Sequence, residues 1–273
     1  MNAPDRPEPA DLNLTPEQSV RRGIYLLPNL LTTGTLFSGY YAIIAAIDGN
    51  FDHAAVAIFV AMVFDGLDGR VARWTHTASS FGKEYDSLSD MVAFGVAPAI
   101  VIYQWGVARI AEYNATWGRV GWLVTFLYAV AAALRLARFN TRTDEVDKRY
   151  FEGLPSPSAA ALIAGFIWCA AKWHLSGLMG LFLALPLTAA AGLLMVSQFY
   201  YSNFKSVHLT KRLRFTSVLL VPLVFILIAM EPPVVLLLGF GGFALSGPIA
   251  ALGRWLRKRS PPALPAPHEE SRA

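Results

Sequence analysis

The sequence predicts an all-α protein, a polytopic integral membrane helical bundle of about eight transmembrane helices, with about six as the lower bound. Of its 273 residues, 55% are hydrophobic and only 15% are charged, whereas a soluble domain carries about 25% charged residues. Its apolar runs approach the ~20 residues that cross the hydrocarbon core as a helix. Helices are favoured over open sheet because backbone polar groups in lipid must be paired within the segment.

The chain divides into three expected regions. Residues 1–20 are polar and rich in proline, which predicts a disordered cytosolic tail. Residues 21–252 form the predicted transmembrane domain, and residues 253–273 read as a basic collar followed by a disordered cytosolic tail. The apolar stretches expected to be helices are 24–47, 54–74, 86–106, 119–138, 156–173, 177–199, 213–230 and 233–252.

These stretches differ in how clearly they predict a span. The first is long enough to cross a bilayer alone, whereas the uninterrupted apolar run of the second ends where Asp65 follows Phe64. The third mirrors the second, because its charged residues lie at its start. Only Glu231, Pro232 and Pro233 separate the last two stretches, which could therefore form a re-entrant pair.

The distribution of positive charge predicts the orientation of the bundle. If the chain crosses an even number of times, 20 of its 23 lysines and arginines lie on the side that holds both termini. Only Arg109, Arg119 and Lys172 lie on the other side. Cytoplasmic loops of membrane proteins are enriched in these residues, so both termini are expected to be cytosolic. The net charge of +4 is too small and too scattered to indicate a nucleic-acid partner.

Four aspartates lie at the membrane edge of the second and third stretches. Asp65 and Asp68 are three residues apart near the end of one, while Asp86 and Asp90 are four apart at the start of the next. Each spacing puts both side chains on one face of a helix. Because a short connection makes the two helices antiparallel, the four carboxylates are expected to face one another. Ionisable groups among apolar helices are costly, which marks these residues as functional candidates.

Converging carboxylates predict a metal site. Four acidic groups in a poorly solvated place repel one another unless cations neutralise them. Oxygen ligands without cysteine suit Mg²⁺ or Mn²⁺ rather than zinc, and two such ions could bind a pyrophosphate. His76, in the connecting loop, is interpreted as a loop residue rather than a ligand.

Two glycines and an arginine accompany the aspartates. Gly69 and Gly82 each lie one helical turn from an aspartate, where the missing side chain leaves room for a bulky ligand between the helices. Close helix packing through small residues is the alternative explanation. Arg73 follows Asp65 by eight residues on the same face, where its guanidinium could hold a phosphate.

These residues together resemble a known family. The pattern Asp65-x2-Asp68-Gly69-x2-Ala72-Arg73-x8-Gly82-x3-Asp86-x3-Asp90 fits the signature of the CDP-alcohol phosphatidyltransferases. The resemblance implies that the four aspartates bind two divalent metal ions and that Asp90 is the catalytic general base. It also implies that Gly69, Arg73 and Ser79 hold the CDP moiety. Asn29 and Thr32, in Pro28-Asn29-Leu30-Leu31-Thr32, resemble a further nucleotide-contacting segment, or they belong to a helix-start device.

Other stretches resemble the phosphatidylserine synthase branch of this family. They are residues 86–99, 135–140 and 151–157. The resemblance implies CDP-diacylglycerol and L-serine as substrates, phosphatidylserine and CMP as products, and a homodimer in the membrane. Arg135 and Arg138, at the cytosolic end of the fourth stretch, could pair with the carboxylate of serine, or they are positive-inside anchors. A bacterial inner (plasma) membrane is expected, with the active site facing the cytoplasm.

Three alternatives remain open at this point. Within the family, the acceptor could be glycerol 3-phosphate, an inositol phosphate or choline, and Arg135, Arg138, Arg142 and Lys148 keep a phosphorylated acceptor in consideration. An intramembrane prenyltransferase also uses aspartate-bound metal, but its two acidic motifs lie far apart in sequence. A cation-coupled transporter could use four membrane carboxylates, although these cluster at one surface. Metal-dependent CMP release would separate the enzymes of this family from a transporter.

Overall fold

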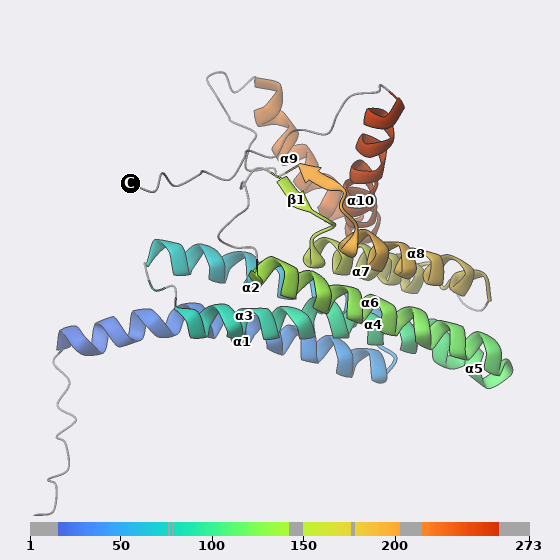
Figure 1. Ribbon diagram of the computed structural model, residues 1–273, viewed down its shortest axis with the longest axis horizontal. Helices are drawn as coiled ribbons and strands as arrows, with labels where there is room; N and C mark the ends of the chain where they lie inside the picture. The colour runs from blue at the N-terminus through green and yellow to red at the C-terminus, as the bar shows by residue number, and fades with distance from the viewer. Residues whose placement is uncertain are drawn as a thin grey trace, which may run out of the picture.

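Most of the chain is helical. The computed structural model describes residues 16–75, 77, 79–141, 150–175, 178–202 and 215–256. Its helices are α1 (Pro16–Ile47), α2 (Phe51–Trp74), α3 (Ser80–Asp90), α4 (Ala97–Ile102), α5 (Ala108–Tyr113), α6 (Ala115–Thr141), α7 (Ser156–Lys172), α8 (Leu178–Val196), α9 (Phe215–Met230) and α10 (Pro232–Leu256). The long helices α1, α2 and α6 run side by side with the α3–α5 segment (Figure 1).

The predicted helical membrane protein is confirmed at the level of fold class. Each predicted apolar stretch coincides with helix over most of its length. Within the described residues, four helical segments are long and apolar enough to cross a membrane: Leu27–Ile47, Ser80–Val107, Ala115–Thr141 and Pro232–Gly253. Helices α7 and α8 are apolar but shorter. The count of about eight spans and the cytosolic placement of both termini therefore stay predictions.

The ends of the chain differ in detail from the expected tails. Helix α1 begins at Pro16, so residues 16–20 are helical rather than part of a disordered tail. Helix α10 continues to Leu256, into the expected basic collar. The rest of both predicted tails, residues 1–15 and 257–273, lies outside the described residues, as does His76.

The third predicted span is longer than expected and contains two π-helical segments. Helical structure runs from Ser80 to Tyr113, with η1 at Met91–Val96 and η2 at Tyr103–Val107. Gly39 of α1 lies against η1, where an added Cβ would be 2.6 Å from the Cα of Ala93. Only glycine permits this close approach of the two backbones. The first π-helical segment follows Asp90 directly, and such segments often occur at functional sites.

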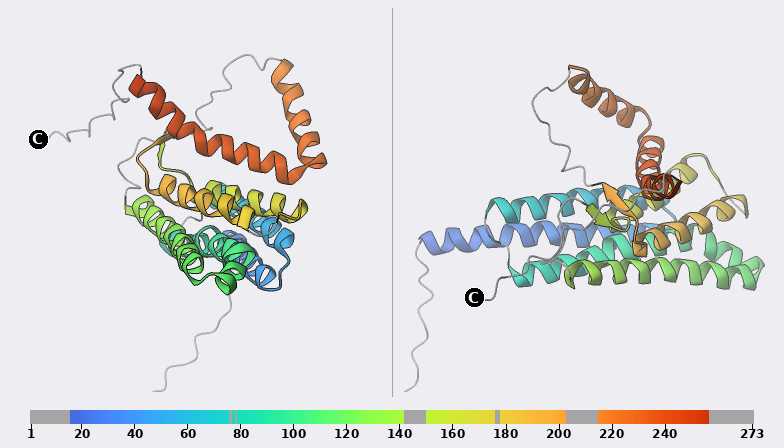
Figure 2. Two further views of the ribbon diagram at one scale, coloured as in Figure 1. Left: turned by 90° about the vertical axis from the view of Figure 1, so that its right-hand side faces the viewer. Right: turned by 45° about the horizontal axis from the view of Figure 1, so that its top comes forward.

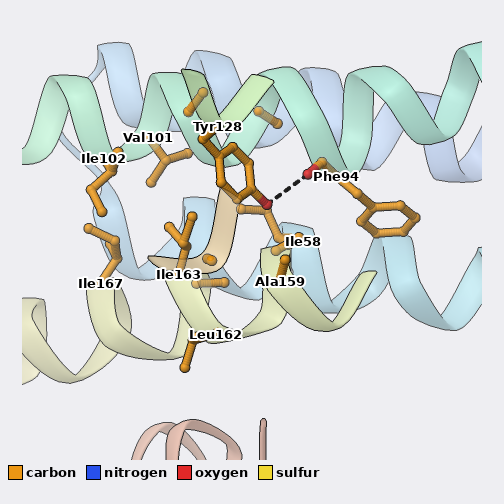
Figure 3. Packing of buried hydrophobic residues seen from close by; sticks show 14 of the residues in the cluster. Ile58, Phe94, Val101, Ile102, Tyr128, Ala159, Leu162, Ile163 and Ile167 are labelled. Atoms are coloured by element: carbon orange, nitrogen blue, oxygen red, sulfur yellow. Dashed lines mark hydrogen bonds between the residues drawn. The ribbon is translucent and has the colours of Figure 1, made fainter. Parts of the chain in front are cut away.

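Small and β-branched side chains fill the core between these helices. Figure 3 shows Ile58 of α2, Tyr128 of α6 and Ile163 of α7 packed around the α3–α5 segment. The Tyr128 hydroxyl is buried and donates a hydrogen bond of 2.9 Å to the carbonyl oxygen of Phe94. A buried hydroxyl needs such a partner, so this bond ties α6 to η1 at a defined register.

A two-stranded ribbon was not predicted. Strand β1 (Tyr150–Glu152) pairs antiparallel with β2 (Tyr200–Ser202). Tyr201 is fully buried and donates to the carbonyl oxygen of Ala244 in α10 at 3.0 Å. Burial raises the pKa of Tyr201 to about 12, because the charged phenolate is disfavoured away from water. The ribbon thus joins the ends of α7 and α8 to α10, which lies with α9 at one side of the bundle (Figure 2).

Candidate functional site

Helices α2 and α3 bring the predicted aspartates together. The connection between them is short, and Ser79 caps α3 by accepting a hydrogen bond of 3.0 Å from the backbone N–H of Gly82. One carboxylate oxygen from each of Asp65, Asp68 and Asp86 lies within 4.8 Å of the others. The predicted convergence of these three side chains is therefore confirmed.

Asp90 completes the acidic site one turn beyond Asp86. It interacts electrostatically with Asp65, Asp86 and Asp68, although it is not in the tightest group of three. The Oδ1 atoms of Asp86 and Asp90 are buried and have no hydrogen-bond partner among the described residues. A buried carboxylate oxygen without a hydrogen-bond donor is unfavourable, so these two atoms fit a site that holds a cation.

The donor set fits hard divalent cations. Carboxylate oxygens are the ligands that Mg²⁺ and Mn²⁺ prefer, and the described site offers no thiolate or imidazole. The prediction of a metal-binding site therefore agrees with the structure, while the choice between the two metals stays open.

Thr32 supports the site from α1. Its hydroxyl donates to Oδ2 of Asp68 at 3.0 Å and also lies 3.1 Å from the carbonyl oxygen of Pro28. Both Thr32 and Asp68 are buried. Groups that hydrogen-bond to metal ligands fix their orientation, so Thr32 orients an aspartate in addition to any contact with a nucleotide.

A cleft of about 180 Å³ opens beside the aspartates between α1, α2 and α3. The residues that line it are Pro28, Asn29, Thr32, Asp68, Gly69, Ala72, Thr77, Ser79, Gly82, Lys83 and Asp86. Five of the six residues predicted to hold CDP-diacylglycerol are thus gathered on one cleft. The sixth, Arg73, is exposed and is not among the lining residues.

The two glycines of the cleft differ in their surroundings. A Cβ added at Gly69 would meet no atom within 4 Å, so this position faces open space. A Cβ at Gly82 would lie 3.2 Å from Oγ of Ser79 and 3.5 Å from Oδ1 of Asn29. Gly69 therefore leaves room for a ligand, as expected, whereas Gly82 also permits the close packing of α3 on α1.

Two lining residues were missed by the sequence analysis. Lys83 follows the motif glycine Gly82, and a basic residue at that place could have indicated an anion site. Thr77 lies in the loop between α2 and α3, is buried, and contacts the hydroxyl of Thr75 at 2.7 Å. No local pattern distinguishes Thr77 from an ordinary loop threonine.

The structure separates the two arginines that were predicted together as acceptor-binding residues. Arg135 interacts electrostatically with Asp90 and Asp65, and its NH1 group donates to Oγ of Ser156 at 2.6 Å. Arg138 donates instead to the carbonyl oxygen of Val196 at the end of α8, at 3.4 Å. Arg135 is therefore coupled electrostatically to the acidic site, whereas Arg138 contacts the neighbouring helix end.

Fold and site together define a class of protein, a helical membrane protein with a cluster of carboxylates beside a cleft. A family model described as CDP-alcohol phosphatidyltransferase matches residues 25–196, which include the whole site. The chain belongs to the CDP-alcohol phosphatidyltransferase family and is an enzyme of that family.

Three proteins of known name are similar to this chain. The CDP-diacylglycerol–serine O-phosphatidyltransferase of Helicobacter pylori is 39% identical over 203 residues, which cover 74% of this chain and 83% of the relative. The enzyme of the same name from Mycobacterium tuberculosis is 37% identical over 172 residues, 57% of each chain. The archaetidylserine synthase of Methanothermobacter thermautotrophicus is 38% identical over 177 residues, 64% of this chain and 69% of the relative.

Proposed function

We propose that this protein transfers a phosphatidyl group from CDP-diacylglycerol to L-serine, giving phosphatidylserine and CMP. The observation that carries the proposal is the cleft between α1, α2 and α3, which gathers five predicted donor-binding residues beside the aspartates. Membership of the family supports the donor and the reaction type. Serine occurs in the names of the bacterial relatives, and the archaeal relative is named for a serine lipid, which supports serine as the acceptor.

Two divalent ions, Mg²⁺ or Mn²⁺, are assigned to Asp65, Asp68, Asp86 and Asp90. When bound, such ions polarise the pyrophosphate and stabilise the negative charge that CMP carries as it leaves. The chain's own contribution is to hold four carboxylates in a poorly solvated place, with Thr32 fixing one oxygen of Asp68.

The cleft is assigned to the CDP part of the donor. Asn29, Thr32 and Ser79 offer polar atoms along its wall, while Gly69 leaves open the space that a side chain would fill. Gly82 keeps α3 close to α1. The exposed guanidinium of Arg73, in the last turn of α2, is available to the donor's phosphates.

Asp90 is assigned as the general base. A serine hydroxyl is a weak nucleophile at neutral pH, so a base must lie within hydrogen-bond reach of it. Asp90 lies outside the tight group formed by Asp65, Asp68 and Asp86, which leaves one of its carboxylate oxygens for the proton. In the proposed step the serine oxygen bonds to the β-phosphorus, the bond from that phosphorus to the CMP oxygen breaks, and Asp90 takes the hydroxyl proton. No covalent enzyme intermediate is needed.

Arg135 is assigned to the carboxylate of serine. Its guanidinium interacts electrostatically with Asp90 and Asp65, and a planar guanidinium pairs well with a carboxylate. Arg138 is the weaker candidate, because it already donates to the carbonyl oxygen of Val196. We further propose a homodimer, as the family resemblance implies, in a bacterial inner membrane with the active site toward the cytoplasm. The distribution of lysine and arginine supports this orientation.

Acceptor competition tests the proposal. Purified protein in lipid nanodiscs receives CDP-diacylglycerol with Mg²⁺ or Mn²⁺, and CMP release is compared for L-serine, glycerol 3-phosphate, inositol phosphate and choline. We expect release that needs the metal and is fastest with L-serine. Release that prefers another acceptor would overturn serine as the acceptor and leave the family assignment intact. Absence of metal-dependent CMP release with every acceptor would overturn the proposed reaction.

A further inference from the structure

Ser156 lies at the start of α7, where it contacts Arg135 of α6. It is the first residue of α7 and is fully buried. Its hydroxyl accepts the hydrogen bond from NH1 of Arg135, 21 residues earlier in the chain, at 2.6 Å. Hydrogen bonds that involve an ionised group are stronger than neutral ones, so this contact holds the guanidinium in one place.

Arg135 keeps hydrogen-bonding capacity beyond this contact. Its Nε is buried and has no hydrogen-bond partner in the part of the chain that the structure describes. Among the described residues, Arg135 makes no ion pair with a carboxylate, although it interacts electrostatically with Asp90 and Asp65. A buried guanidinium N–H without a hydrogen-bond partner is energetically costly. The carboxylate of the serine substrate would accept this hydrogen bond and supply a compensating negative charge.

The chain segment before Ser156 fixes its position. The N–H of Gly153 donates to the carbonyl oxygen of Phe199, and the N–H of Leu154 donates to that of Leu194, both at 2.9 Å. Gly153 has a φ of 78°, and a Cβ there would lie 2.3 Å from the carbonyl oxygen of Met195. Leu154 is fully buried. These contacts hold the entry into α7 against the end of α8, so Ser156 is presented to Arg135 from a rigid support.

We propose that Ser156 is a positioning residue for recognition of the acceptor, because it holds the Arg135 guanidinium where it binds the acceptor's carboxylate. This inference rests on the proposed transfer to serine. It assigns a role to the segment 153–156, which lines no part of the donor cleft. Loss of the Ser156 hydroxyl should weaken binding of the acceptor's carboxylate without changing binding of CDP-diacylglycerol.

The test separates acceptor recognition from donor recognition. The variants are Ser156→Ala, the conservative Ser156→Thr, and Ser158→Ala as the matched control in the same turn of α7. Each is assayed for CMP release with L-serine and with serinol, in which a hydroxymethyl group replaces the carboxylate. Thermal unfolding in the same nanodiscs checks that each variant is folded.

We expect Ser156→Ala to raise the KM for L-serine about tenfold or more, as expected for a lost hydrogen bond to a charged group. The KM for CDP-diacylglycerol and the rate with serinol should stay at the wild-type level, and Ser156→Thr should restore part of the L-serine affinity. Ser158→Ala should behave as wild type.

Two kinds of failure can be told apart. An unchanged KM for L-serine in Ser156→Ala, or an equal rise for L-serine and CDP-diacylglycerol, would overturn the role of Ser156 while wild type still prefers serine. A wild-type protein without preference for L-serine would overturn the proposed acceptor and this inference with it. If Ser156→Thr is unfolded, the comparison of L-serine with serinol in Ser156→Ala still decides the question.

Discussion

The hydroxyl of Thr32 donates a hydrogen bond to Oδ2 of Asp68 at 3.0 Å, which joins α1 to α2 at the wall of the cleft. Asp68 is one of the three aspartates whose oxygens lie within 4.8 Å of one another. Thr32 therefore acts on the acidic site through one of its carboxylates, and in the proposed metal site α1 would support metal binding without supplying a carboxylate.

Replacing Thr32 by valine should weaken metal binding. Valine keeps the shape of the side chain but loses the donor to Asp68, and loss of such a supporting bond typically costs about tenfold to a hundredfold in metal affinity. Titration of CMP release with Mg²⁺ or Mn²⁺ measures this change. Thr35→Val is the control, because the buried Thr35 hydroxyl donates to the carbonyl oxygen of Leu31 in its own helix, at 3.4 Å. Equal metal requirements for the two variants would contradict the role of Thr32.

Gly69→Ala should fold normally but bind the donor poorly. The added Cβ meets no atom within 4 Å, so the protein can accommodate it, but it enters the space assigned to CDP. We expect a rise in the KM for CDP-diacylglycerol and an unchanged unfolding temperature. Gly66→Ala is a matched control, because its Cβ also meets no atom within 4 Å and Gly66 does not line the cleft. A donor KM that rises equally in both variants would show a general effect on α2.

Asp90→Asn should abolish turnover while largely retaining donor binding. The amide keeps the shape of the side chain but cannot accept the proton, and a general base contributes about 10² to 10⁴ in rate. CMP release measures turnover, and equilibrium binding of CDP-diacylglycerol measures affinity. The exposed Asp52, in the first turn of α2, supplies the control Asp52→Asn. Normal turnover in Asp90→Asn would remove Asp90 from the proposed role.

Tyr128→Phe should destabilise the protein by about 1 kcal/mol, because it removes a buried hydrogen bond and leaves the carbonyl oxygen of Phe94 without this donor. The loss should appear as a lower unfolding temperature in nanodiscs. Tyr40→Phe is the control, since Tyr40 is exposed on α1. An equal unfolding temperature for the two variants would mean that the bond to η1 contributes nothing to stability.

The helices and the acidic site could be predicted because their causes are local. Apolar runs define helices in lipid, and the spacing of Asp65 with Asp68 and of Asp86 with Asp90 puts each pair on one helix face. A short loop then brings the two faces together, whatever the rest of the chain does. The same reasoning could not predict that Asp90 lies outside the tight group of the other three aspartates, because its position depends on the rotation of α3 relative to α2.

Features that depend on distant packing could not be predicted. Arg135 and Arg138 look equivalent in the sequence, and only the positions of α7 and α8 show that one reaches Ser156 and the other reaches Val196. The ribbon pairs Phe151 with Tyr201, 50 residues later, through strands of three residues each. Such short strands carry no periodic signal. The π-helical turns after Asp90 likewise arise from tertiary packing rather than from local propensity.

The described residues that line the cleft all come from positions 28–86, whereas Arg135 and Ser156 come from later helices. On the proposed assignments, recognition of the two substrates is encoded in separate stretches of the chain. We then expect mutations in α6 and α7 to alter the choice of alcohol while binding of CDP-diacylglycerol stays intact. With this arrangement, new headgroup specificities can evolve while the donor-binding segment is kept. Such specificities can be engineered in chimeric proteins joined between α5 and α6.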